Sequence, residues 1–194
     1  MRLILTRNGE TEGNKLGILH GQIPGKLSST GIEQAKKLAL RLKGEKIDYI
    51  YSSDLARSAD TAKEISKHNS NTQIEFVKDL REQNLGVFQG KTMDDLGISE
   101  KDFPTAFASP KGGESLSQLY KRAESFLHKT LQKHNNSTVL FVGHNGVNKA
   151  LLASIIGSKQ EDIKNQHNTG VSIFEISEGG KSKIRIFNCV KHLK

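Results

Sequence analysis

The segment Thr138–Val142 constrains the fold most, because it is a continuous apolar run that contains β-branched residues. A strand of this kind is typical of parallel sheets that helices cover on both faces. The run ends at Gly143, and an apolar helical pattern follows over Val147–Ile156, with Gly157 placed to end it. This passage from strand to helix predicts a layered α/β domain.

Strands and helices alternate along most of the rest of the chain. Further strands are expected at 3–6, 48–51, 73–77, 171–176 and 183–190, and helices at 30–42, 52–67 and 116–131. Two capping boxes are expected, Thr30 with Glu33 and Ser115 with Gln118. Short helical pieces are expected near Met93 and Phe107, inside a loop-rich stretch from 78 to 113. The pattern predicts a three-layer domain with a mixed, mainly parallel sheet, and one domain for residues 1–194.

The net charge of +8 discriminates little between partners. A lysine-rich solvated surface explains it, and so does attraction to a phosphorylated metabolite. Only 6% of the residues are aromatic and none is tryptophan, so a nucleic-acid partner is not expected. The chain lacks a run long enough to span a membrane and a signal-peptide pattern, and Cys189 is its single cysteine. We expect no membrane partner and a cytoplasmic location.

Polar residues follow three of the expected strands, in the segments 6–11, 52–57 and 143–146. Ligands bind beyond the carboxyl ends of the strands in sheets of this kind. Arg7, Arg57 and His144 would therefore meet at one edge, where guanidinium groups match phosphate oxygens in charge and geometry. A helix that starts near Gly146 would add backbone donors. The sequence predicts a phosphate site.

Each of these pieces has an ordinary reading when taken alone. Asn8 before Gly9 is typical of a turn, Arg57 of a helix surface, His144 of a satisfied core histidine and Glu82 of a solvated carboxylate. Their convergence at one edge of a sheet favours the functional reading.

The segment Leu5–Thr11 resembles the L-x-R-H-G-E-T signature of the histidine phosphatase (phosphoglycerate-mutase-like) superfamily, with Asn8 at the histidine position. The blocks at 51–62, 80–82, 112–115 and 142–146 resemble the later blocks of that family, in the same order. The resemblance spans almost the whole chain and favours the short phosphatase branch.

The resemblance implies a six-stranded sheet with helices on both faces, and phosphoryl transfer through a phosphohistidine without a metal or other cofactor. Arg7, Arg57 and His144 would neutralise the transferring phosphoryl group. Glu82 would protonate the leaving alkoxide and then activate water. The residues implied to contact substrate are Arg7, Asn14, His20, Gly21, Gln22, Arg57, Glu82, His144 and Asn145.

Asn8 cannot replace the attacking histidine, because the lone pair of an amide nitrogen is delocalised into its carbonyl. That nitrogen would take the place of the ring nitrogen nearer the backbone and keep a hydrogen bond to the main chain. We expect turnover to be lost or reduced by several orders of magnitude, and phosphate binding to survive.

Two explanations fit a pocket that is otherwise complete. One is a deliberate substitution that traps substrate, and the other is a natural, non-catalytic phosphoester-binding protein. The presence of Glu82 favours the first, because a sensor has little use for an acid–base group. A third and weaker alternative is nucleic-acid binding through the basic surface.

The expected partner is a phosphorylated small molecule or inorganic phosphate. A phosphatase is favoured over a phosphoglycerate mutase, because the span Gln83–Lys111 is short and Asn84–Lys91 resembles the phosphatase type. Lys91, Lys101 and Lys111 are expected to be solvated rather than to bind a second anionic group. A homodimer is compatible with the resemblance, since many relatives dimerise by a strand edge, but nothing in the sequence demands it.

Overall fold

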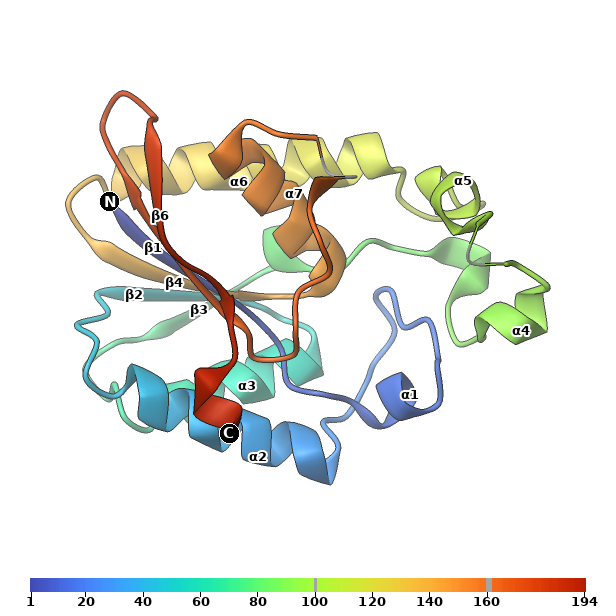
Figure 1. Cartoon of the computed structure of the whole chain (residues 1–194), viewed down its shortest axis with the longest axis horizontal. Helices are drawn as coiled ribbons and strands as arrows, with labels where there is room; N and C mark the ends of the chain where they lie inside the picture. Colours follow the sequence, from blue (N-terminus) through green and yellow to red (C-terminus); the bar gives the residue numbers. More distant parts are fainter. Residues whose placement is uncertain (100, 160–161) are drawn as a thin grey trace.

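A six-stranded sheet in the order β3-β2-β4-β1-β5-β6 forms the centre of the computed structural model, which describes residues 1–99, 101–159 and 162–194 (Figure 1). The strands are β1 (Arg2–Arg7), β2 (Tyr49–Ser53), β3 (Ile74–Val77), β4 (Thr138–Gly143), β5 (Val171–Ile176) and β6 (Ser182–Cys189). The pairs β3–β2, β2–β4 and β4–β1 are parallel, whereas β5 is antiparallel to both β1 and β6. The predicted mixed, mainly parallel sheet is confirmed.

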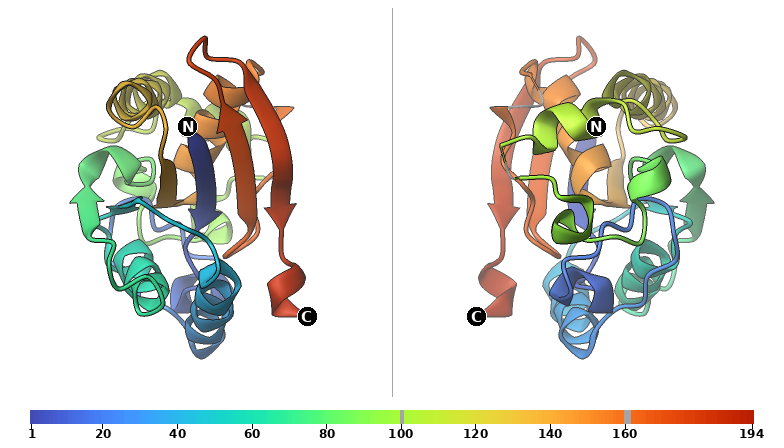
Figure 2. Two further views of the ribbon diagram at one scale, coloured as in Figure 1. Left: turned by 90° about the vertical axis from the view of Figure 1, so that its left-hand side faces the viewer. Right: turned by 90° about the vertical axis from the view of Figure 1, so that its right-hand side faces the viewer.

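Two pairs of helices cover the two faces of the sheet (Figures 1 and 2). They are α2 (Ser29–Leu42) and α3 (Ala56–Ser66) on one face, and α6 (Leu116–Lys133) and α7 (Asn145–Ile156) on the other. Leu140 and Val142 of β4 pack with α2 and α3, whereas Val139 and Phe141 pack with α6 and α7. Burial on both sides is the reason that β4 is apolar at successive positions.

Short helical turns fill the segments beyond the carboxyl ends of the parallel strands. They are α1 (Glu12–Lys15), η1 (Lys78–Leu80), η2 (Gly86–Phe88), α4 (Met93–Leu96) and α5 (Phe103–Ala108), and η4 (Lys191–Leu193) follows β6. The predicted helical pieces near Met93 and Phe107 are therefore confirmed. Within the described ranges, no helix has the length and apolar character needed to cross a membrane.

Ser28, rather than Thr30, caps α2. The Oγ of Ser28 accepts a hydrogen bond from the amide of Gly31 at 3.0 Å and donates one to Glu10 at 2.7 Å, whereas Glu33 pairs with Lys36 on the surface. The predicted capping box of Thr30 with Glu33 is therefore wrong, because a contact with the distant Glu10 favours the earlier cap.

The start of α3 also differs from the prediction. The helix expected from residue 52 begins at Ala56, because Ser52 and Ser53 complete β2. The other predicted capping box, that of Ser115 and Gln118, is confirmed at the start of α6.

Candidate active site

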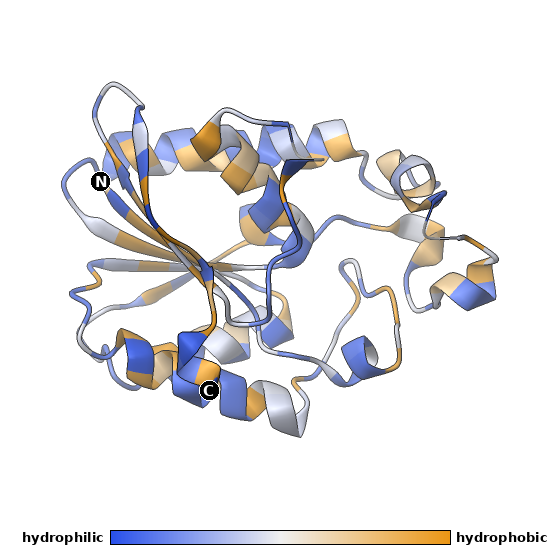
Figure 3. Cartoon of the chain, viewed as in Figure 1, coloured by the Kyte–Doolittle hydropathy of each residue, from blue (hydrophilic) through white to orange (hydrophobic). Residues whose placement is uncertain are grey.

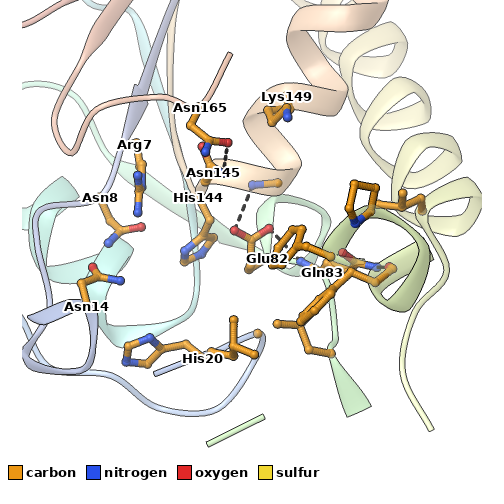
Figure 4. Close-up of a pocket in the computed structure, with 18 of the residues that line it drawn as sticks. Arg7, Asn8, Asn14, His20, Glu82, Gln83, His144, Asn145, Lys149 and Asn165 are labelled. Carbon is orange, nitrogen blue, oxygen red and sulfur yellow. Dashed lines mark hydrogen bonds between the residues drawn. The ribbon is translucent and has the colours of Figure 1, made fainter. Parts of the chain in front are cut away.

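A cavity of about 780 Å³ opens where β1, β2 and β4 end. All the predicted site residues except Gln22 line it, and Figure 4 shows most of them pointing into it from separate elements. The lining residues among the predicted set are Arg7, Asn8, Asn14, His20, Gly21, Arg57, Glu82, His144 and Asn145.

Arg57, in the first turn of α3, is held by hydrogen bonds from all three of its nitrogens. Its Nε donates to Nδ1 of His144 at 3.1 Å, while Nη1 and Nη2 donate to the carbonyls of Ile23 and Gly21 at 3.1 and 2.7 Å. The side chain is 4% exposed. The same contacts hold the 21–23 loop against the wall of the cavity.

His144 is neutral in this arrangement. A guanidinium only donates hydrogen bonds, so Nδ1 of His144 has to be unprotonated to accept from Arg57. Its proton lies on Nε2, which faces the hydroxyls of Ser53 and Ser58 at 2.9 and 3.2 Å. Burial, and then the charges of Arg57 and Arg7, hold the pKa of His144 well below its usual range.

The positive charge at the cavity comes from two guanidinium groups. Burial lowers the pKa of Arg57 to about 10 and also lowers the pKa of Arg7, while the charge of Glu82 raises both. Both arginines remain cationic at neutral pH. Nη1 of Arg7 donates to the carbonyl of Gln166 at 2.6 Å, which fixes one edge of this guanidinium.

Asn8 lies at the end of β1 and is 3% exposed. Its Nδ2 donates to the carbonyl of Gly9 at 2.7 Å, which is the main-chain hydrogen bond expected from the sequence. A carbonyl only accepts, so the amide nitrogen must face Gly9 and Oδ1 faces the cavity, as Figure 4 shows. Asn8 therefore presents a hydrogen-bond acceptor next to Arg7.

Gly9 allows the segment after β1 to pass directly beside the start of α2. A Cβ atom at this position would lie 2.5 Å from the carbonyl oxygen of Gly31, closer than real Cβ contacts. The amide of Gly9 donates to Oγ1 of Thr61 in α3 at 3.1 Å. The backbone that carries Asn8 is thus held by two helices.

The loop from Asn14 to Gln22 supplies one side of the end of the cavity that holds Arg7 and Arg57, which we call the polar end. Oδ1 of Asn14 accepts from the amide of Thr11 at 3.0 Å, and Figure 4 shows its amide nitrogen pointing into the cavity. Burial and the charge of Arg57 lower the pKa of His20. Gln22 ends this loop, and its Nε2 donates to the carbonyl of Glu82 at 2.9 Å, so it supports Glu82 rather than lining the cavity.

Glu82 sits at the amino end of α7. Its Oε2 accepts from the amide of Gly146 at 2.9 Å, and its Oε1 accepts from those of Val147 at 3.2 Å and Gln83 at 2.9 Å (Figure 4). A carboxylate is favoured there by the positive end of the helix dipole. The donors of Gly146 and Val147 therefore serve Glu82, which corrects the expectation that the start of this helix is free to bind phosphate.

Arg122 of α6 holds the backbone that carries Glu82. It forms a bidentate ion pair with Glu114, with distances of 2.9 and 2.7 Å, and donates to the carbonyls of Asp79 and Arg81 at 2.7 and 3.0 Å. The block 112–115, for which the sequence suggested no role, thus contributes through Glu114 to the position of Glu82.

Sequence reasoning missed the side of the cavity that faces away from the arginines. It is largely apolar, with a few polar groups at its edge: Ile18, Leu19, Gln83, Leu85, Phe103, Pro104, Phe107, Leu116, Ser117 and Tyr120. Three further polar residues that line the cavity were also missed: Lys149, Lys159 and Asn165. The two phenylalanines of α5 lie in an otherwise polar, loop-rich stretch of the sequence. This contrast is the signal from which an apolar side of the cavity could have been predicted. Lys91, Lys101 and Lys111 are exposed and do not line the cavity, as expected.

The family model "Histidine phosphatase superfamily (branch 1)" matches residues 3–189. The chain belongs to this superfamily. The match covers the six strands, apart from Arg2 at the start of β1, and the residues at the end of the cavity that holds the arginines.

Three relatives of this histidine-phosphatase chain illustrate the range of the superfamily. The chain is 37% identical to "Metal-independent phosphoserine phosphatase" of Arabidopsis thaliana over 161 residues, 79% of this chain and 68% of the relative. The structure of Bacillus stearothermophilus YhfR superposes with a TM-score of 0.88 at 28% identity, over 100% of this chain and 99% of that one.

The third relative is a mutant of phosphoserine phosphatase from Entamoeba histolytica, in which a histidine is replaced by alanine, in complex with phosphoserine. It superposes with a TM-score of 0.84 at 28% identity and covers 100% of this chain and 99% of its own. In the present chain, among the described residues, no group of three or more histidine, cysteine, aspartate or glutamate side chains is placed to hold a metal ion.

Proposed function

We propose that this chain binds small phosphomonoesters at the polar end of the cavity and hydrolyses them slowly or not at all. Its superfamily consists of histidine phosphatases. Asn8 takes the place of the attacking histidine, directly after Arg7 at the end of β1. The observation that carries the proposal is the hydrogen bond from Nδ2 of Asn8 to Gly9, which leaves only a carbonyl oxygen facing the cavity.

The binding groups are Arg7, Arg57 and Asn14. The guanidinium groups of the buried Arg57 and the partly buried Arg7 supply positive charge, and charge-assisted hydrogen bonds to phosphate oxygens are about twice as strong as neutral ones. Asn14 adds a neutral donor from the opposite side. None of these contacts needs a nucleophile, so the loss of the histidine leaves the attraction for phosphate in place.

The chemical step is the part that fails. In the superfamily mechanism, the histidine attacks phosphorus and Glu82 protonates the leaving oxygen, with His144 contributing to the phosphate pocket. An amide oxygen at position 8 cannot form the covalent intermediate. Direct attack by water on phosphorus is then the remaining route, without the division into two easier steps that nucleophilic catalysis offers.

The Entamoeba histolytica mutant in complex with phosphoserine supports the separation of binding from turnover, since a relative without one histidine holds a phosphomonoester. The short segment between Glu82 and Glu114 favours a phosphatase ancestry over a mutase ancestry. The ligand class is therefore a phosphomonoester of a small molecule, with inorganic phosphate as its simplest member.

Isothermal titration of the chain with inorganic phosphate tests binding, and a stopped assay with p-nitrophenyl phosphate tests turnover. We expect saturable binding of phosphate and turnover several orders of magnitude below that of the Asn8→His variant. Turnover by the unaltered chain at the rate of that variant, or a lack of phosphate binding, would contradict the proposal.

A further inference from the structure

The cavity continues from its polar end into an apolar wall formed by Leu19, Leu85, Phe103, Phe107 and Leu116. Four separate stretches contribute to it: the loop after α1, the residue before η2, α5, and the first residue of α6. Figure 3 shows apolar residues in the loop after α1 and in α5, both beyond the carboxyl ends of the strands. The wall lies outside the sheet, and most of it is separate from the two cores that pack against the sheet.

The wall is built by specific contacts. The ring of Phe103 stacks on that of Phe107 at 4.1 Å with an interplanar angle of 17°, and Phe107 contacts Phe88 at 5.1 Å. Leu19 is pinned by its amide, which donates to the carbonyl of Lys91 at 2.9 Å. The side chains therefore have a defined arrangement although Phe103 is 41% exposed.

Gln83 joins the apolar wall to the polar end. Its Nε2 donates to the carbonyls of Phe107 and Glu114, both at 2.8 Å, and its backbone amide donates to Glu82. Gln83 directly follows Glu82, and its buried side chain is hydrogen-bonded to Phe107 of α5. This one side chain therefore sets the distance between Glu82 and α5. A phosphoester whose phosphate lies between Arg7 and Arg57 would extend its alcohol past Glu82 toward this wall.

We propose that the cavity selects phosphomonoesters of apolar alcohols over phosphoserine. This inference rests on the proposed function. The free energy of binding becomes more favourable when a ligand removes exposed apolar side chains of a cavity from water. The ammonium and carboxylate of phosphoserine would lose hydration against the same wall without matching partners. The chain thereby differs from relatives whose names refer to phosphoserine.

Lys149 and Asn165 offer the competing possibility, because they line the cavity on the other side of Glu82 (Figure 4). A ligand carboxylate would find its positive partner in Lys149, which is half-buried on α7. The experiment therefore has to compare an apolar series with phosphoserine and to include a Lys149→Gln variant.

The test is isothermal titration of the full chain with inorganic phosphate, methyl, butyl and hexyl phosphate, and phosphoserine. Burial of one methylene contributes about 0.8 kcal/mol, so affinity is expected to rise about fourfold per carbon from butyl to hexyl phosphate. Hexyl phosphate is expected to bind more tightly than phosphoserine. The Lys149→Gln variant is expected to leave this order unchanged.

The Phe103→Ser variant is expected to weaken hexyl phosphate about tenfold and to leave inorganic phosphate unchanged. Phe187→Ser on β6 is the matched control, because Phe187 is 40% exposed and does not line the cavity. The Leu19→Ser variant tests the wall from a different segment, and a melting curve of each variant shows whether it is folded.

The outcomes separate the two proposals. If inorganic phosphate does not bind, the proposed function fails. If phosphate binds but affinity is flat along the alkyl series, or phosphoserine binds more tightly than hexyl phosphate and depends on Lys149, the selection for apolar alcohols is overturned while phosphate binding stands.

Discussion

Nε of Arg57 donates a hydrogen bond to Nδ1 of His144, and this bond fixes the protonation state of the imidazole. The same guanidinium holds the loop that carries Gly21 and Ile23. One residue therefore links the tautomer of a buried histidine to the shape of the cavity. Protonation of His144 would place two donors against each other at this contact.

Folding stability is expected to fall as the pH drops below about 6.5, the usual pKa of histidine. The pKa of His144 is lowered in the folded chain, so the unfolded chain binds more protons between that lowered value and 6.5. The contribution of the group is complete above 6.5 and is lost progressively below it, at no more than about 1.4 kcal/mol per pH unit. Urea unfolding between pH 5 and 8 measures the slope.

The variant His144→Gln is expected to reduce this slope, because glutamine does not titrate. His128→Gln, at an exposed position of α6, is the control and should leave the slope unchanged. Part of the slope should remain in His144→Gln, since burial also lowers the pKa of His192 to about 4. An unchanged slope in His144→Gln would show that His144 is not the group responsible.

The Asn8→His variant is expected to gain phosphatase activity by several orders of magnitude. The rest of the polar end is in place, and an imidazole adds the nucleophilic nitrogen that an amide lacks. Hydrolysis of p-nitrophenyl phosphate and detection of an acid-labile phosphohistidine measure the gain. Asn8→Ala, which adds no nucleophile, should remain as slow as the unaltered chain. Equal rates in both variants would argue against the role assigned to position 8.

Arg7→Gln is expected to weaken the binding of inorganic phosphate by about 2 kcal/mol, or roughly thirtyfold, because it removes a charged hydrogen bond. Titration calorimetry measures the change. Arg185→Gln is the control for lost positive charge, since Arg185 pairs with Glu175 on the surface of the sheet edge. A similar loss in both variants would point to a general effect of net charge and not to a phosphate contact.

Glu82→Ala is expected to lower the free energy of unfolding by about 2 kcal/mol, because two backbone amides at the start of α7 and the amide of Gln83 lose their acceptor. Urea unfolding of the variant measures the loss. Glu82→Gln keeps one side-chain oxygen and should lose less. Glu124→Ala, on the exposed face of α6, should change stability little. A stable Glu82→Ala chain would show that the contacts with α7 contribute little to folding.

The residue pattern of the strands, together with the rule that ligands bind beyond the carboxyl ends of parallel strands, was enough to predict the sheet and the polar end of the cavity. Arg7, Arg57 and His144 each follow a strand that the residue pattern predicts, and parallel strands end at one edge. Once the strands were recognised, the meeting of these three side chains followed from the fold class, although they lie far apart in the chain.

Contacts between distant segments were not predictable in the same way. Ser28 prevails over Thr30 as the cap of α2 because it also reaches Glu10, and both residues are of types that cap helices. The contact of Glu82 with Gly146 joins two segments without any shared pattern. The resemblance implied that Gln22 contacts substrate, whereas its side chain turns to the backbone of Glu82.

The hydrogen bonds of Glu82 to the start of α7 give evolution a structural reason to retain this residue. A residue that caps a helix is retained by purifying selection for a folded chain, whether or not the chain catalyses a reaction. Glu82 can therefore persist in a lineage that has given up turnover, and its presence beside Asn8 is no record of recent activity. Because the capping contacts give Glu82 a structural use in either case, its presence does not distinguish a deliberate substitution from a natural phosphoester-binding protein.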